Sequence, residues 1–162
     1  MEGLGDNKNE IKTFNVPSND NNSVLFKLSK ERIIELAFVA HSEGKLFEAN
    51  KYYQLFIDQG FNDPRVFSNY GMICHQEGKI KKAINLFERS IRLFPRSSDA
   101  YINLGNILQD IGENKKAEII TRKALEIKPG IAMGHYNLGV ILRSQGKLVE
   151  AEIEALKSIK YN

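Results

Sequence analysis

Three asparagines stand 34 residues apart, at Asn69, Asn103 and Asn137. A side-chain amide donates through its nitrogen and accepts through its oxygen, so each can pair with both polar groups of a peptide backbone. We call these three residues the asparagine ladder. Each net hydrogen bond is worth about 0.5–1.5 kcal/mol, whereas micromolar binding needs about 8 kcal/mol. A site built on the ladder therefore requires further contacts.

Residues that commonly perform catalysis or bind metals are few and scattered. His41 and His75 share one place in the 34-residue spacing, but neighbouring helix axes pack about 8–10 Å apart, too far for a shared metal. Cys74 occupies an apolar contact position and has no histidine beside it as a base. The sequence has no glycine-rich phosphate loop and no metal-spaced His/Cys cluster. We therefore predict no catalysis, no cofactor and no metal.

A repeat of 34 residues underlies this spacing. It is most visible in two series of small residues: Gly44, Gly78, Gly112 and Gly146, and Ala49, Ala83, Ala117 and Ala151. Pro95 likewise recurs as Pro129. A period of this length is typical of a solenoid of helix pairs. The sequence thus predicts an all-α fold, an α-solenoid of antiparallel helix pairs in which side chains one period apart lie on one surface.

Each repeat divides into a helix A and a helix B. In the second repeat we expect helix A from Pro64 to Glu77 and helix B from Ile80 to Leu93, with Gly78 supplying the left-handed residue between them. N-caps are predicted for three of the four repeats, at Ser29, Asp63 and Ser97, whereas Ile131 cannot cap. Glycines inside helix A cost about 1 kcal/mol each relative to alanine. Gly71, Gly105 and Gly139 therefore predict close approach of helix B at Ala83, Ala117 and Ala151.

These residues resemble the tetratricopeptide repeat, which is also 34 residues long. With Pro64 as position one, positions seven and eight are Tyr70-Gly71, Leu104-Gly105 and Leu138-Gly139, and position twenty is the alanine series. The chain departs from the family pattern at position twenty-four, which changes from Tyr53 and Phe87 to Thr121 and Ala155. The resemblance covers four repeats (30–63, 64–97, 98–131 and 132–162) and implies a right-handed superhelix.

The resemblance also implies a concave groove lined by the A helices, with the asparagine ladder at position six on its wall. The predicted binding residues share that wall: Asn69, Asn103, Asn137, Arg65, Met72, His75, Asn106, Tyr136 and Arg143. The chain is similar in this respect to arrays, such as that of the O-linked N-acetylglucosamine transferase, that hold extended peptides. We therefore predict a scaffold whose partner is a protein or an extended peptide.

Acidic chaperone tails, which some proteins of this family bind, are not an expected partner. Co-chaperones of this family bind acidic chaperone tails through a clamp with Lys, Asn, Asn, Lys and Arg at set positions. From the first repeat this chain offers, in that order, Ile34, Phe38, Asn69, Asp99 and Asn103. The frame that starts one repeat later also matches at a single position. The cations that would hold the carboxylates are missing.

The composition of the chain bears on its partners and on its compartment. The net charge of +3 is too small to predict nucleic-acid binding, and no stretch is apolar enough to span a bilayer, so we expect neither nucleic acid nor membrane as a partner. A single cysteine excludes an internal disulfide and is typical of a reducing compartment, which favours a cytoplasmic protein. Residues 1–28 are rich in Asn and Asp and are predicted to be a flexible tail, followed by the repeats in 29–162.

The fourth repeat leaves two alternatives open. The chain stops one residue short of the position where that repeat would place its proline. If Ile153, Leu156 and Ile159 are partly exposed there, self-association through this uncapped repeat would give a self-assembling structural array. Alternatively, the chain is the N-terminal, substrate-presenting region of a larger glycosyl-, sulfo- or methyltransferase.

Overall fold

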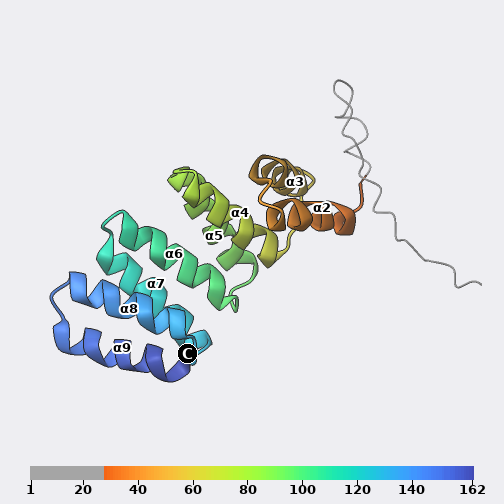
Figure 1. Cartoon of the computed structure of the whole chain (residues 1–162). Coiled ribbons are helices and arrows are strands. Elements are labelled where there is room, and N and C mark those ends of the chain that lie inside the picture. The colour runs from red at the N-terminus through yellow and green to blue at the C-terminus, as the bar shows by residue number, and fades with distance from the viewer. Residues whose placement is uncertain (1–27) are drawn as a thin grey trace, which may run out of the picture.

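The computed structural model describes residues 28–162, and this part of the chain is entirely helical, with no strand. Its eight helices form four antiparallel pairs: α2 (Lys30–Ser42) with α3 (Leu46–Asp58), α4 (Pro64–Gln76) with α5 (Ile80–Leu93), α6 (Ser98–Asp110) with α7 (Asn114–Ile127), and α8 (Ala132–Ser144) with α9 (Leu148–Tyr161) (Figure 1). The predicted tail, residues 1–28, lies outside the described residues except for Leu28, which packs against the first core.

Glycines end the A helices as predicted. Gly44, Gly78, Gly112 and Gly146 all have positive φ, between 72° and 81°, so each supplies the left-handed residue that turns the chain into helix B. In the second repeat the Gly78 N–H donates to His75 O at 2.9 Å. The predicted bounds of α5 are confirmed, and α4 ends one residue earlier than predicted, at Gln76.

Two of the three predicted N-caps are confirmed. Ser29 accepts from the Arg32 N–H at 3.2 Å, and Asp63 accepts from the Arg65 N–H at 2.9 Å. The prediction for Ser97 is wrong, because its side chain makes no capping bond. Its backbone is not extended as a capping residue requires (φ −81°, ψ 89°), and its N–H donates to Phe94 O instead.

The glycines inside the A helices do allow helix B to approach closely, but mostly at another position than predicted. A Cβ added to Gly71 would lie 2.6 Å from the Phe87 ring, and one added to Gly105 would collide with the Thr121 hydroxyl. Phe87 and Thr121 are at position twenty-four, four residues after the predicted alanines. Two of the glycines also meet the alanine series: a Cβ on Gly139 would lie 3.2 Å from the Ala151 carbonyl oxygen, and one on Gly105 would lie 3.7 Å from that of Ala117.

The A helices form the inner side of the stack. Helices α4, α6 and α8 lie side by side, while α5 packs on α6 and α7 packs on α8 (Figure 1). The B helices thus contact the next A helix more than they contact each other. This arrangement brings A-helix residues from successive repeats onto one wall.

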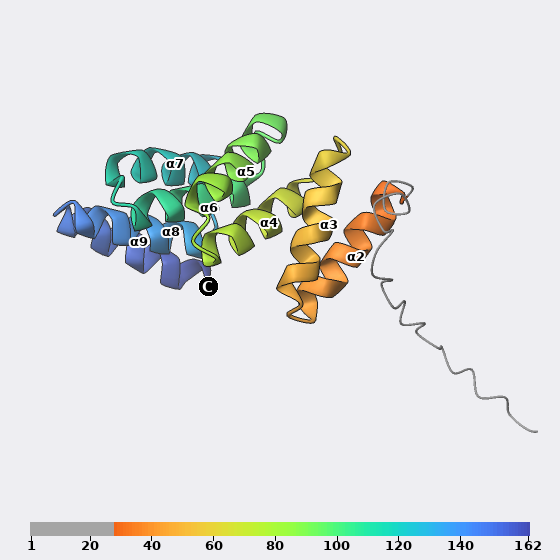
Figure 2. The same cartoon turned by 90° about the horizontal axis from the view of Figure 1, so that it is seen from above.

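The first helix pair is set at an angle to the others. Seen from above, α3 runs steeply across the end of α4, whereas α6, α8 and α9 run nearly alongside one another (Figure 2). The connection differs here, because α3 has 13 residues where the later B helices have 14, and Gly60 (φ 76°) follows it. Phe61 also stands where later repeats have Pro95 and Pro129. One core cluster nevertheless runs from α2 to α6.

Candidate functional site

A small pocket lies on the inner wall between α4 and α6. Its volume is about 90 Å³, and six residues line it: Met72, His75, Gln76, Phe87, Asn103 and Asn106. Four of these are among the nine predicted binding residues. We call this the groove pocket. This volume exceeds the ~10–15 Å³ that one water molecule needs, so the pocket has room for a short side chain.

The groove pocket is polar at its rim and apolar at its base. His75 Nε2 lies 3.1 Å from Asp110 Oδ2 across the two helices, and both side chains are partly exposed. Phe87 is fully buried, whereas Met72 is 46% exposed. Asn103 and Asn106 are three residues apart on α6 and therefore lie on the same face. The pocket thus offers amide groups beside apolar surface, which suits a backbone segment with one inserted side chain.

Sequence reasoning missed two residues of this pocket. Gln76 is at position thirteen, which faces the groove in this family, and that signal could have found it. Phe87 lies on α5, a B helix, whereas the repeat pattern places only A-helix residues on the groove, so the pattern gave no signal for it. It reaches the pocket since Gly71 leaves room for its ring beside α4.

The asparagine ladder does not present three equivalent amides. Asn69 and Asn103 are partly exposed, whereas Asn137 is only 5% exposed. The Nδ2 of Asn137 has no hydrogen-bond partner within residues 28–162. Asn69 lies beside Tyr53: burial raises the pKa of the Tyr53 hydroxyl, and a hydrogen bond with Asn69 opposes that rise. Only Asn103 lines the groove pocket.

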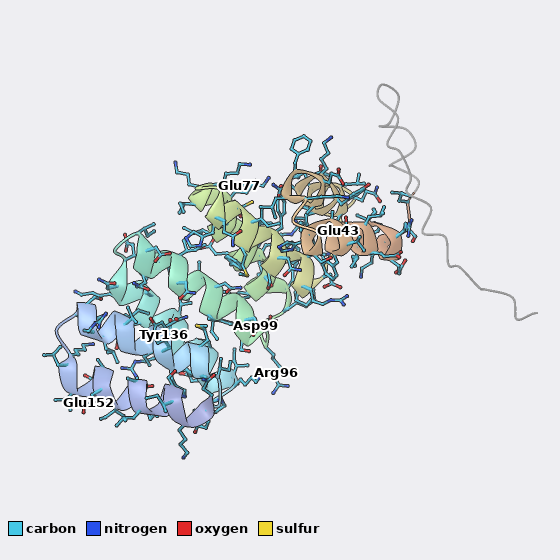
Figure 3. All side chains as sticks on the ribbon, viewed as in Figure 1. Glu43, Glu77, Arg96, Asp99, Tyr136 and Glu152 are labelled. Carbon is cyan, nitrogen blue, oxygen red and sulfur yellow. The ribbon has the colours of Figure 1, made fainter. Side chains whose placement is uncertain are left out.

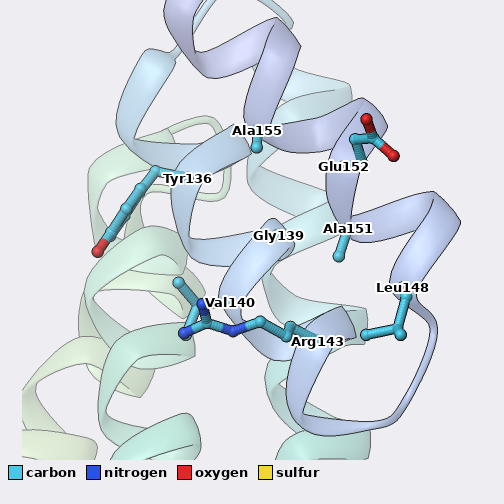
Figure 4. Close-up of a pocket in the computed structure, with 8 residues that line it drawn as sticks. All are labelled: Tyr136, Gly139, Val140, Arg143, Leu148, Ala151, Glu152 and Ala155. Carbon is cyan, nitrogen blue, oxygen red and sulfur yellow. The ribbon is translucent and has the colours of Figure 1, made fainter.

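Arg65, at the start of α4, is already paired with a neighbouring carboxylate. Its guanidinium donates to both carboxylate oxygens of Asp63, at 3.0 and 2.8 Å, and lies 5.5 Å from the centre of the Phe38 ring. Burial raises the pKa of Asp63, but the hydrogen bonds from Arg65 outweigh this and hold that pKa below its ordinary value. The two remaining predicted residues, Tyr136 and Arg143, line a different pocket, between α8 and α9 (Figure 4). Figure 3 shows Tyr136 on α8 in the context of the whole stack.

The histidines and the cysteine have structural surroundings. His41 Nδ1 lies 3.0 Å from the Tyr53 hydroxyl, and His135 is buried between Glu154 and the carbonyl of Pro129. Cys74 is fully buried, and this burial raises the pKa of its thiol, which disfavours the reactive thiolate. Residues 28–162 contain no group of three or more His, Cys, Asp or Glu side chains that could hold a metal ion.

Comparison with known proteins agrees with this geometry. Residues 75–135 match the family model described as "Tetratricopeptide repeat". The solved structure of MamA superposes with a TM-score of 0.76 at 22% identity, covering 82% of this chain and 78% of MamA. YrrB, described as "a TPR protein with an unusual peptide-binding site", gives 0.72 at 19% identity, with 83% and 69% coverage. PilF of Pseudomonas aeruginosa gives 0.75 at 18% identity, with 83% and 61% coverage.

Four stacked helix pairs and these likenesses define a helical-repeat solenoid. The match to the tetratricopeptide repeat family covers residues 75–135, and the described helices form the same fold as these solved structures, a right-handed superhelix of four helix pairs. This fold is typical of scaffolds for protein–protein interaction. A sequence comparison with curated proteins gives no match. None of the eight described helices combines the length and the hydropathy needed to cross a membrane.

Proposed function

We propose that the inner wall of α4, α6 and α8 binds an extended segment of a partner protein, with the groove pocket at its centre. The observation that supports this most is the pocket itself, which joins Met72 and His75 of one repeat to Asn103 and Asn106 of the next. The peptide-binding site named for YrrB, a protein of the same fold, supports a peptide as the ligand. The proposed role is that of a cytoplasmic, non-catalytic scaffold.

In this proposal the two amides hold the ligand backbone and the pocket takes one side chain. Two net hydrogen bonds contribute about 1–3 kcal/mol, and a buried aliphatic side chain adds about 1.5–3 kcal/mol. The sum, about 2.5–6 kcal/mol, falls short of the ~8 kcal/mol of a micromolar complex. The ligand therefore extends along the wall beyond the pocket.

The outer members of the asparagine ladder are the natural further contacts. Asn69 is partly exposed on α4, one helix pair before Asn103. Asn137 carries a buried amide nitrogen with no partner in the described residues. An unpaired buried donor costs about 1–3 kcal/mol, which a ligand carbonyl that reached it would recover.

The test compares two sets of asparagine substitutions. Asn103→Ala with Asn106→Ala removes both amides of the groove pocket, whereas Asn85→Ala removes an exposed amide on α5 and is the matched control. Partners captured from a cell lysate are identified by mass spectrometry, and their tiled peptides are then titrated by fluorescence anisotropy. We expect the double variant to lose at least tenfold in affinity, about 1.4 kcal/mol. The same partners at the same affinity, with circular dichroism unchanged, would refute the proposal.

A further inference from the structure

The face of α8 and α9 that points away from α6 and α7 carries a second pocket. Its volume is about 310 Å³, and its floor is made of small residues: Gly139, Ala151 and Ala155. Tyr136 and Arg143 rise from α8 on one side and Leu148 and Glu152 from α9 on the other (Figure 4). We call this the end pocket. No element of residues 28–162 lies on it, and beyond its rim Ile159 is 75% exposed.

The two preceding repeats show what covers the same face inside the chain. Ile91 in the second repeat packs against Tyr101 and Ile102 of α6, and Leu125 in the third packs against Leu138 and Leu142 of α8. Ile159 is the residue 34 positions after Leu125. In both earlier repeats an A helix covers part of this position, so the end face continues an interface that the chain forms twice.

The polar contacts of the internal interfaces also have counterparts at the end pocket. Lys147 donates to Glu118 at 2.9 Å, and the residue equivalent to Glu118 is Glu152. His75 faces Asp110 of the next A helix, and the residue equivalent to His75 is Arg143. Glu152 and Arg143 make no ion pair within the described part of the chain. Both charges line the end pocket, and each stands at a place that is paired in one earlier repeat, through Glu118 in the third and His75 in the second.

We infer that the end pocket binds one amphipathic helix of a partner protein, in the position that α8 takes against α6 and α7. The contacts of the internal interfaces indicate which side chains this partner helix carries. It carries apolar residues at the places of Leu138, Ile141 and Leu142, an acid at that of Ser144 to meet Arg143, and a lysine at that of Lys147 to meet Glu152. The place of Gly134 takes a residue no larger than valine, because Val66 and Ala100 stand there in the two other A helices that pack on a preceding repeat.

A second copy of this chain does not fit the same position head to tail. Its leading helix, α2, has Arg32 where α8 has Gly134, and Arg32 is paired with Glu35 at 2.8 Å on the surface. Glu43 replaces Gln145, whose amide donates to the Asn114 carbonyl at 3.1 Å. A carboxylate there would face another acceptor, the carbonyl of Leu148. The leading face of α2 is therefore suited to solvent, and the occupant is a different helix.

The test uses a labelled synthetic peptide with the sequence of residues 130–147 and the change Ser144→Asp. We expect saturable binding to the whole chain by fluorescence anisotropy, with NMR shift changes confined to α8 and α9. Ala155→Arg, at an exposed position on the pocket floor, should weaken binding at least tenfold. Ile119→Arg is the matched control, since Ile119 is 68% exposed on α7 outside this pocket, and it should leave binding unchanged.

A charge exchange tests the register of the helix. Glu152→Lys should weaken the peptide about 1.5- to 5-fold, the range for exposed ion pairs, and Lys147→Glu in the peptide should restore the loss. No saturation at about 1 mM peptide, where ~4 kcal/mol suffices for half-occupancy, would overturn the proposal, as would equal binding by Ala155→Arg. A chain that dimerises on its own, and that Ala155→Arg turns into a monomer in sedimentation, would overturn it in favour of self-association. Asn103→Ala with Asn106→Ala leaves this binding intact, which separates the end pocket from the groove.

Discussion

The close contact between Gly71 and Phe87 predicts that two similar substitutions have opposite effects on stability. Gly→Ala inside a helix is worth about 1 kcal/mol of helix propensity. In Gly71→Ala the new Cβ would lie 2.6, 2.8 and 2.9 Å from three atoms of the Phe87 ring, where carbon atoms prefer about 3.5–4.0 Å. The ring is 1% exposed and cannot turn away. Overpacking costs about 1–3 kcal/mol, and an enclosed ring places this case at the upper end, so we expect a net loss of about 2 kcal/mol.

Gly134→Ala is the matched control. Its Cβ would lie 2.8 Å from the Leu125 Cδ2, but that atom is the tip of a flexible, partly exposed side chain that can rotate. We therefore expect no loss, or a gain of up to about 1 kcal/mol. Urea unfolding followed by circular dichroism measures both variants. If Gly71→Ala is as stable as the unchanged chain, close helix approach does not explain the glycine at this position.

Two further predictions follow from the caps and from the buried pair in the fourth repeat. Asp63→Ala should cost about 1 kcal/mol of stability in urea unfolding because it removes a cap, whereas Ser97→Ala should cost less than about 0.5 kcal/mol; equal losses would contradict the cap assignment. Burial raises the pKa of Glu154, but hydrogen bonds from Lys157 and His135 outweigh it and hold that pKa below 4.5. Because the folded pKa is the lower one, the stabilisation is complete above pH 4.5 and is lost as the pH falls through the folded value. Glu154→Gln should therefore lower the free energy of unfolding at neutral pH by about 1.5–3 kcal/mol. It should also make that free energy depend less on pH below 4.5, as measured by urea unfolding at a series of pH values. The same decrease at acid pH in the variant and the unchanged chain would contradict this prediction.

The helix boundaries could be predicted from the sequence because the chemistry that sets them is local. A glycine that must adopt positive φ, a proline that cannot continue a helix and a regular apolar spacing act within a few residues. The bounds of α5 and the turn glycines are confirmed for this reason. The prediction of an N-cap at Ser97 is wrong because the backbone N–H of Ser97 donates to Phe94 O in a turn. The type of side chain alone does not reveal this turn.

The site was harder to predict, because equal positions in a repeat do not have equal neighbours. Asn69, Asn103 and Asn137 share one position, yet one lies beside Tyr53, one lines the groove pocket and one is buried. Their surroundings depend on residues from the adjacent repeat, such as Tyr53 beside Asn69 and Met72 beside Asn103. The 34-residue period fixes where an amide stands on its helix, but not how much space the next repeat leaves around it.

The residue at position twenty-four explains why the two pockets differ in size. The groove pocket and the end pocket are built from equivalent parts, since Met72, His75 and Phe87 correspond to Val140, Arg143 and Ala155. Phe87 fills the space above Gly71, and the next A helix closes what remains to about 90 Å³. Ala155 leaves the same space open at about 310 Å³. A large residue at position 155 would cover Gly139 as Phe87 covers Gly71. The alanine instead keeps the helix backbone accessible, as the approach of another helix requires.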